Sequence, residues 1–249
     1  MTEEVQLTEE ARNDLAPRGV LRAGINEGNQ VLVSARSRDG GPDGVAPALA
    51  AELARRLGVP LQLVPYPSPG VLGDRAGADE WDVALLAADP ARATAMDFTS
   101  PYAELPVTYL AHAGSKITSP AEADQPGQVI VATQGSAYAL WLEAHLVQAT
   151  LVRPGRAAEA RELFAAHEDY LLAGLASSLA GAASQLPRTL VLPGHFMTAQ
   201  QAIACPPAHP AGLAYLQAFV TEAITSGLVA ALTGRFGVGQ GLNVAPVPQ

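Results

Sequence analysis

The 249-residue sequence has one cysteine, Cys205, and one lysine, Lys116. A single thiol cannot build an internal disulfide framework, so cysteine usage leaves the redox compartment undetermined. Because Cys205 lies in an apolar run before two prolines, we interpret it as a buried, inert thiol and not as a nucleophile. The sequence also has no H-x-x-x-H pair and no cysteine cluster. We therefore predict no metal site and no cofactor.

Charge is also scarce. Charged residues make up 16% of the chain and hydrophobic residues 49%, which is typical of a globular protein. The net charge of −9 argues against binding to nucleic acid or to an anionic membrane surface. No apolar run approaches the length of a transmembrane helix. The acidic N-terminus lacks the apolar stretch of a secretory signal, which predicts a cytoplasmic protein; the alternative is a periplasmic or extracytoplasmic protein whose leader was removed.

Short apolar runs alternate with helical patterns along the chain, which predicts an α/β fold with parallel strands. The central stretch, residues 81–102, opens with an apolar run at 83–88. This run is too short for a typical helix and is predicted to be a strand. Asp89 and Pro90 then break the strand and favour the start of a short helix at 91–95.

Arg92 lies in the first turn of this short predicted helix. A cation there opposes the helix dipole, whereas the free N–H groups of a helix N-terminus favour an anion. Arg92 is therefore either an anion-binding residue or an ordinary solvated arginine. A second anion-binding candidate is Gly135 with Ser136, where a predicted strand leads into a helix at 137–145. The alternative there is a plain helix with Ser136 as its N-cap.

Polar residues also follow the first predicted strand, residues 20–25. Glu27, Asn29 and Gln30 lie at its carboxyl end, where ligands gather in open α/β sheets. They are candidate ligand contacts or, alternatively, ordinary turn residues. His195, much later in the chain, is either a structural histidine or an acid–base group.

Five motifs occur in order along the chain. They are L-R-A-G-I-N at 21–26, G-V-A-P-A-L-A-A-E-L-A-R-R-L-G-V at 44–59, W-D-V-A-L-L-A-A-D-P-A-R at 81–92, D-F-T-S-P-Y at 97–102 and Q-G-S-A-Y at 134–138. Together they resemble the bacterial solute-binding proteins of family 3, the polar-amino-acid type. The resemblance covers about residues 21–226 and implies a type II periplasmic-binding fold. In that fold, two α/β lobes are joined by two hinge strands, and the ligand lies in the cleft between the lobes.

The resemblance also implies how the chain is divided. The hinges are expected near residues 107–113 and 195–202. The expected parts are an N-terminal helix at 1–19, lobe one from 20–110 and 196–236, lobe two from 111–195, and an irregular tail at 237–249.

In this family, an arginine after the corresponding strand grips the ligand α-carboxylate, and Arg92 matches it. The loop that opens a lobe-two helix donates N–H groups to the same carboxylate. The resemblance thus implies a ligand site without catalytic residues. The predicted ligand-binding residues are Glu27, Asn29, Gln30, Ala87, Ala88, Arg92, Gly135, Ser136, Ala137, Tyr138 and His195.

Two departures from the family pattern bear on the ligand. Ala87 and Ala88 stand in the region where amino-acid-binding members carry a serine or threonine before the arginine. Gly174 stands where those members carry an aspartate that pairs with the ligand amine. Either Glu27 supplies the missing negative charge, or the ligand is a carboxylate without an amine.

We therefore expect a binding protein that captures a small organic anion, an amino acid or a related carboxylate, by hinge closure in ABC-type uptake. One alternative is a leaderless cytoplasmic enzyme on the same fold, dehydratase-like and acting on a cyclic carboxylate. The other is a sensor or partner-binding module without a ligand. Expected partners are the carboxylate ligand and an ABC transporter permease or another protein, but not nucleic acid. The chain is expected to be a monomer or a homodimer.

Overall fold

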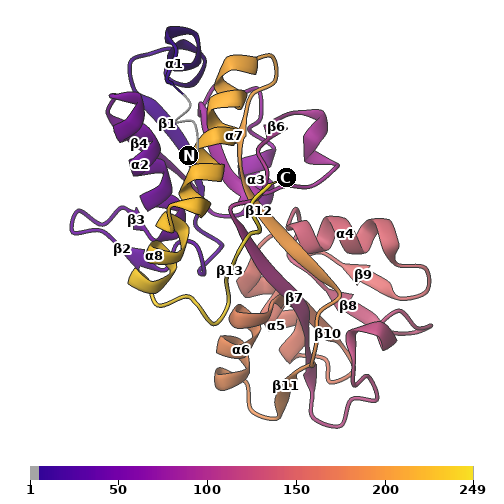
Figure 1. Cartoon of the computed structure of the whole chain (residues 1–249). Coiled ribbons are helices and arrows are strands. Elements are labelled where there is room, and N and C mark those ends of the chain that lie inside the picture. Colours follow the sequence, from indigo (N-terminus) through magenta and orange to yellow (C-terminus); the bar gives the residue numbers. More distant parts are fainter. Residues whose placement is uncertain (1–5, 249) are drawn as a thin grey trace. The chain divides into compact units, whose positions relative to one another are not determined.

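Figure 1 shows the computed structural model, which describes residues 6–248. The chain forms two compact units. Unit one comprises the chain up to Glu104 together with the chain from Gln200, and unit two comprises Leu105–Ala199. The chain passes from one unit to the other within strands β7 (Ala103–His112) and β12 (Met197–Cys205). Residues 1–5 of the segment predicted as an N-terminal helix, and Gln249 of the predicted tail, lie outside the described residues.

The other strands of unit one are β1 (Leu21–Asn26), β2 (Ala35–Arg36), β3 (Pro42–Asp43), β4 (Leu61–Tyr66), β5 (Val83–Ala87), β6 (Asp97–Phe98) and β13 (Asn243–Val244). The main sheet has the order β4–β1–β5–β12. Strand β1 runs parallel to β4 and β5, whereas β12 runs antiparallel to β5. Strand β6 pairs with β12, and β2 with β3 forms a separate hairpin. The parallel core of this sheet agrees with the predicted α/β class.

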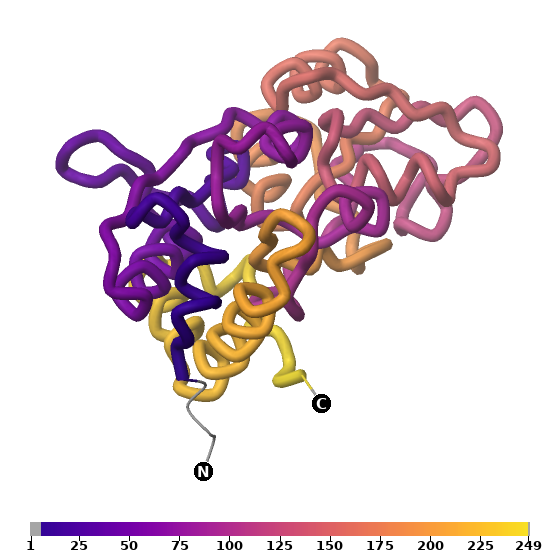
Figure 2. Tube along the Cα trace, turned by 90° about the horizontal axis from the view of Figure 1, so that it is seen from above, coloured from indigo at the N-terminus to yellow at the C-terminus, as the bar shows by residue number. Residues whose placement is uncertain are grey.

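The helices of unit one are α1 (Glu9–Leu15), α2 (Val45–Leu57), α3 (Pro69–Gly73), α7 (Pro210–Thr225) and α8 (Leu228–Arg235), with a 3-10 turn, η1 (Arg92–Thr94). Local signals explain their ends. The Thr8 hydroxyl accepts the N–H of Ala11 and starts α1, and Gly58 ends α2 at a φ of 66°. Figure 2 shows α1 beside α7, where the Gly212 N–H donates to the Asp14 carboxylate at 2.8 Å.

Pro65 lies inside β4, although a proline there predicts that the strand ends at Val64. Strand β4 is at the edge of the sheet and pairs with β1, with Pro65 opposite Ile25. A proline is tolerated on an edge strand because its missing N–H can face away from the partner strand. The strand therefore continues to Tyr66.

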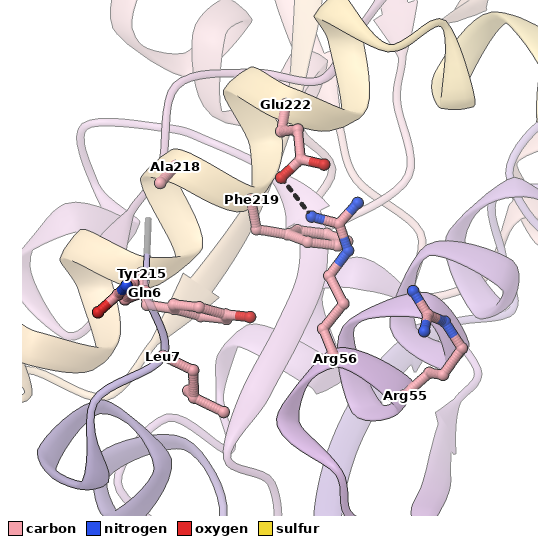
Figure 3. A pocket seen from close by; sticks show the side chains of 8 residues that line it. All are labelled: Gln6, Leu7, Arg55, Arg56, Tyr215, Ala218, Phe219 and Glu222. Carbon is pink, nitrogen blue, oxygen red and sulfur yellow. Dashed lines mark hydrogen bonds and ion pairs between the residues drawn. The ribbon is translucent and has the colours of Figure 1, made fainter. Parts of the chain in front are cut away.

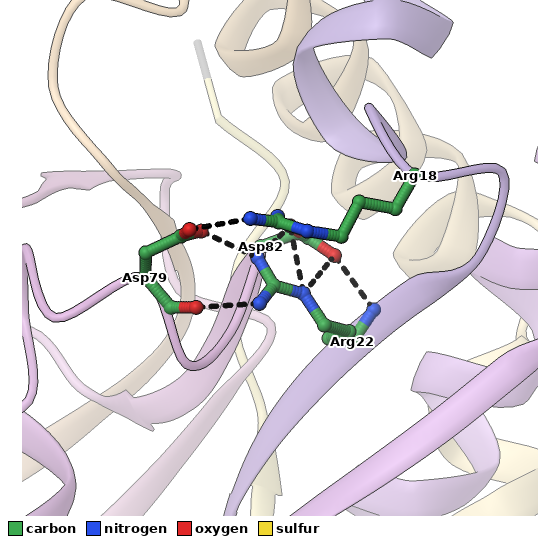
Figure 4. Close-up of polar contacts among 4 residues, drawn as sticks. All are labelled: Arg18, Arg22, Asp79 and Asp82. Atoms are coloured by element: carbon green, nitrogen blue, oxygen red, sulfur yellow. Dashed lines mark hydrogen bonds and ion pairs between the residues drawn. The ribbon is translucent and has the colours of Figure 1, made fainter.

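Arg22, near the start of β1, and Asp82, just before β5, join these two strands at their amino ends. The Arg22 backbone N–H donates to Asp82 Oδ2 at 2.8 Å, and its guanidinium donates to Asp82 Oδ1 at 2.6 Å. The Arg22 side chain is 11% exposed and the Asp82 side chain 3%. Asp79 and Arg18 add outer contacts, as Figure 4 shows. The hydrogen bond to Asp82 raises the pKa of Arg22, so this cation stays charged.

Unit two contains β8 (Val129–Val131), β9 (Thr150–Val152), β10 (Leu171–Leu175), β11 (Thr189–Val191), α4 (Ala137–His145), α5 (Ala157–Ala165), α6 (Ala176–Gln185) and a 3-10 turn, η2 (Pro120–Glu122). Its sheet has the order β7–β10–β8–β9, with β11 on β7. Successive side chains of β7 enter different core clusters. Tyr109 packs in the cluster that includes Leu142 of α4, and Leu110 packs with Phe164 of α5 and Leu179 of α6.

The structure differs from the expectation of an irregular tail at residues 237–249. Within this tail β13 pairs antiparallel with Ala103 and Glu104 at the start of β7. The flanking Leu242 and Ala245 are buried. The apolar stretch is too short to show a strand periodicity among the surrounding glycines and prolines, so the sequence pattern does not reveal it.

Within residues 6–248, no single helix is long and apolar enough to cross a membrane. Helices α7 and α8 meet the criterion of length and composition only when taken together, and the pair bends by 65°.

Candidate functional site

The loops that follow β1 and β5 lie at one edge of the unit-one sheet. The two strands are parallel neighbours, with Ile25 opposite Leu85, so both chains leave the sheet at its carboxyl edge. This edge holds the predicted ligand-binding residues of unit one, which are Glu27, Asn29, Gln30, Ala87, Ala88 and Arg92.

In the loop that follows β1, two of the predicted ligand-binding side chains already have partners within unit one. Asn29 is 9% exposed, and its Oδ1 accepts the backbone N–H groups two and three residues later at 3.2 and 3.3 Å. The Glu27 carboxylate forms an ion pair with Arg36 of the β2–β3 hairpin. Gln30 is exposed. Asn29 therefore shapes the loop, and Arg36 balances the charge of Glu27.

Arg92 is buried at this edge, with 8% of its surface exposed. Its Nη1 donates to the backbone oxygen of Ala87 at 2.7 Å, which ties the guanidinium to the end of β5. Burial lowers the pKa of Arg92, and the carboxylates of Asp89 and Asp74 act in the opposite direction. This burial excludes the alternative of a solvated surface arginine. A guanidinium presents its N–H donors in a planar fork, a geometry that matches a carboxylate.

The short helix predicted at 91–95 is a three-residue 3-10 turn, η1. The Asp89 carboxylate accepts the N–H of Ala91 at 2.8 Å just before this turn. One turn aligns too few peptide dipoles to create an appreciable macrodipole. Anion binding at this edge would therefore depend on the guanidinium of Arg92, and not on a helix N-terminus.

The amino end of α4 is the second candidate anion site, and it lies in unit two. The Ser136 Oγ accepts the N–H of Ala139 at 3.1 Å, which confirms Ser136 as the N-cap. The N–H groups of Ala137 and Tyr138 belong to the first turn, where an α-helix supplies no acceptor. Gly135 has a φ of 67°, a left-handed conformation that favours glycine. This local geometry suits an anion held by backbone N–H groups.

His195 is exposed and lies just before β12. Its neighbour Phe196 stacks on Tyr109 of β7 with ring centroids 4.5 Å apart. The Phe196 ring centroid also lies 5.3 Å from that of Trp141 on α4. These aromatic contacts fix α4 against β7 and so position its amino end.

Gly174 lies inside β10, at the position where the family resemblance implies an amine-binding aspartate. A Cβ built on Gly174 would lie 3.0 Å from the Leu179 side chain, so a larger residue there requires local repacking. Sequence reasoning missed Glu104 and Gln200, whose side chains are hydrogen-bonded at 3.2 Å in unit one. The sequence feature that could have identified this pair is the Glu104 carboxylate, which lies within the apolar run that forms β7.

A cavity of about 610 Å³ lies elsewhere in unit one (Figure 3). The Arg56 Nη1 donates to Glu222 Oε2 at 2.6 Å, and its guanidinium carbon lies 5.1 Å from the Phe219 ring centroid. Helix α2 ends here before β4 begins, so the cavity lies toward the amino ends of the strands. Its lining residues are Gln6, Leu7, Arg55, Arg56, Tyr215, Ala218, Phe219 and Glu222.

Cys205 is fully buried, as expected from its apolar run, and burial raises the pKa of its thiol to about 12. Among residues 6–248, no group of three or more histidine, cysteine, aspartate or glutamate side chains is placed to hold a metal ion.

The chain belongs to the bacterial extracellular solute-binding proteins, family 3, whose family model matches residues 21–239. This match confirms the family inferred from the five sequence motifs. No curated protein sequence gives a significant match.

Solved structures share the fold, and three of them are described here. An amino acid ABC transporter substrate-binding protein from Streptococcus pneumoniae, bound to L-arginine, is 18% identical with a TM-score of 0.74, covering 90% of this chain and 97% of its own. A binding component of an ABC transporter from Wolinella succinogenes, complexed with lysine, is 22% identical with a TM-score of 0.73, covering 88% and 95%. An ancestral amino acid-binding protein, a precursor of cyclohexadienyl dehydratase, is 19% identical with a TM-score of 0.73, covering 90% and 98%. These likenesses confirm the type II periplasmic-binding fold.

Proposed function

We propose that this protein binds a small organic carboxylate, an amino acid or a close analogue, and delivers it to an ABC transporter. The observation that carries the proposal is the buried guanidinium of Arg92, held at the carboxyl edge of the unit-one sheet by its bond to Ala87. Ligands of open α/β sheets bind at this edge. Membership of a solute-binding family supports the same assignment.

A carboxylate suits Arg92 because planar guanidinium and carboxylate groups form paired, charge-assisted hydrogen bonds. Each such bond contributes roughly 1.5–3 kcal/mol. The amino end of α4 is proposed as a second anion-binding element, in unit two, where the N–H groups of Ala137 and Tyr138 stabilise negative charge.

The test is a thermal-shift screen of the purified protein against amino acids, 2-oxo acids and cyclic carboxylates. A ligand at about 100 times its Kd stabilises the protein by roughly 2.7 kcal/mol. For a chain of this size, each kcal/mol corresponds to about 2–4 °C, so the shift should be about 5–11 °C. Arg92→Ala should abolish the shift.

The matched control is Arg38→Ala, which removes an exposed arginine of the same unit and should keep the full shift. Retention of ligand affinity in Arg92→Ala would refute the proposal, as would the absence of any hit. One structural neighbour is a dehydratase precursor, so recovered ligand should also be analysed chemically. Conversion of the ligand would favour the enzyme alternative over a binding protein.

A further inference from the structure

Glu104 of β7 and Gln200 of β12 form a pair of acceptor groups in unit one. The Gln200 Nε2 donates to the Glu104 Oε1 at 3.2 Å, so the two side chains lie on the same side of the sheet. Both residues are partly exposed. They lie where β7 and β12 leave unit one.

Both groups have unused capacity to accept hydrogen bonds. Within residues 6–248, no arginine, lysine or histidine nitrogen lies within 4.0 Å of the Glu104 carboxylate. The Gln200 Oε1 is buried and accepts no hydrogen bond from the described part of the chain. A buried carbonyl oxygen without a donor is costly, and its position beside a carboxylate favours a positively charged donor.

The pair is close to the proposed carboxylate site in the sheet. The Ala88 N–H donates to the Gln200 backbone oxygen at 2.8 Å, directly beyond β5. Arg92 is bonded to Ala87, the residue before Ala88. Neighbouring strands are about 4.8 Å apart, so Gln200 lies one strand from the segment that holds Arg92. Glu104 lies on the next strand of the sheet, β7, beside β12.

We infer that Glu104 and Gln200 form a subsite for a positively charged group of the ligand, an ammonium or a guanidinium. The inference rests on the proposed function and adds the residues that select the cationic group. Local structure disfavours the two other positions at which the family pattern offers a negative charge. Glu27 is paired with Arg36, and the position of Gly174 has no side chain and is crowded by Leu179.

The test uses calorimetric titration with matched pairs that differ by one cationic group. The probes are L-glutamate with 2-oxoglutarate, L-leucine with 4-methyl-2-oxopentanoate, and L-lysine with L-norleucine. In at least one pair, the wild-type protein should bind the member with the additional cationic group, called the cationic member, at least about tenfold more tightly. Glu104→Gln preserves side-chain volume and an acceptor for Gln200 but removes the charge, so it should reduce this preference to less than about twofold.

Gln200→Met is the second variant, and it should also weaken the cationic member selectively. Glu162→Gln, an exposed change on α5, is the control and should leave the preference unchanged. The inference is overturned if Glu104→Gln keeps the preference, or weakens both members of a pair equally. If only the 2-oxo acids bind, and Arg92→Ala abolishes that binding, the inference fails while the proposed function stands. If no probe binds, both fail.

Discussion

Asp82→Ala should destabilise unit one strongly, because it leaves the guanidinium of Arg22 without its inner partner. The Asp82 carboxylate accepts the backbone N–H of Arg22 and three guanidinium contacts of 2.6–3.2 Å. Removing one member of a buried ion pair costs about 3–5 kcal/mol. The remaining contacts of Arg22 with Asp79 place the expected cost near the lower limit, at about 3 kcal/mol.

The measurement is the free energy of unfolding from urea denaturation, with the thermal midpoint as a second readout. At about 2–4 °C per kcal/mol, the midpoint should fall by roughly 6–12 °C. Asp79→Asn is the control, because the Asp79 side chain is 65% exposed, an exposed pair contributes at most about 1 kcal/mol, and asparagine tolerates the positive φ of 55° at this position. An Asp82→Ala loss no larger than that of the control would refute the view that this pair anchors β1 to β5.

Two further predictions concern ionisable groups. Hydrogen bonds from Arg55 and Arg56 lower the pKa of Glu52 to about 2 from 4.5, so its contribution to stability is complete above pH 4.5 and is lost as the pH falls toward 2. Glu52→Gln should therefore flatten the stability profile in this window of acid-titrated urea unfolding; an unchanged slope would contradict the assignment. Cys205, with its pKa raised to about 12, should resist alkylation by iodoacetamide at pH 8 in the folded protein and react fully in denaturant. Rapid labelling of the native protein, followed by mass spectrometry, would show that the thiol is accessible.

Local sequence signals predicted much of the fold. Ser136 caps α4, and Asp89 with Pro90 ends β5, as the sequence indicates, and Gly58 ends α2 in the left-handed conformation typical of a helix C-terminus. These features depend on neighbours within a few residues, so single-sequence patterns contain them. Pro65 shows the limit, because its tolerance in β4 depends on the strand's position at the sheet edge. That position is a property of the tertiary structure.

The same distinction applies to the candidate site. Its place after a strand leaves Arg92 either an anion-binding or a solvated arginine, and the family resemblance favours the first; its burial depends on packing beside Gly73 and the end of β5. Glu104 and Gln200 are about a hundred residues apart in sequence and meet through strand pairing. No local period or short motif encodes such a meeting. The Arg22–Asp82 pair was not predicted for the same reason, because its two residues are far apart in sequence and meet only in the folded sheet.

The order in which the chain is synthesised has a consequence for unit one. Strand β5 lies between β1 and β12, but β12 is made only after all of unit two. Until the ribosome has produced Gln201, which pairs with Ala87, one side of β5 exposes unsatisfied N–H and C=O groups. Unit two is continuous in sequence and needs no later segment to complete its sheet. A nascent chain therefore carries an open sheet edge while unit two is being synthesised, and a product truncated before β12 retains that edge as a site for intermolecular strand pairing.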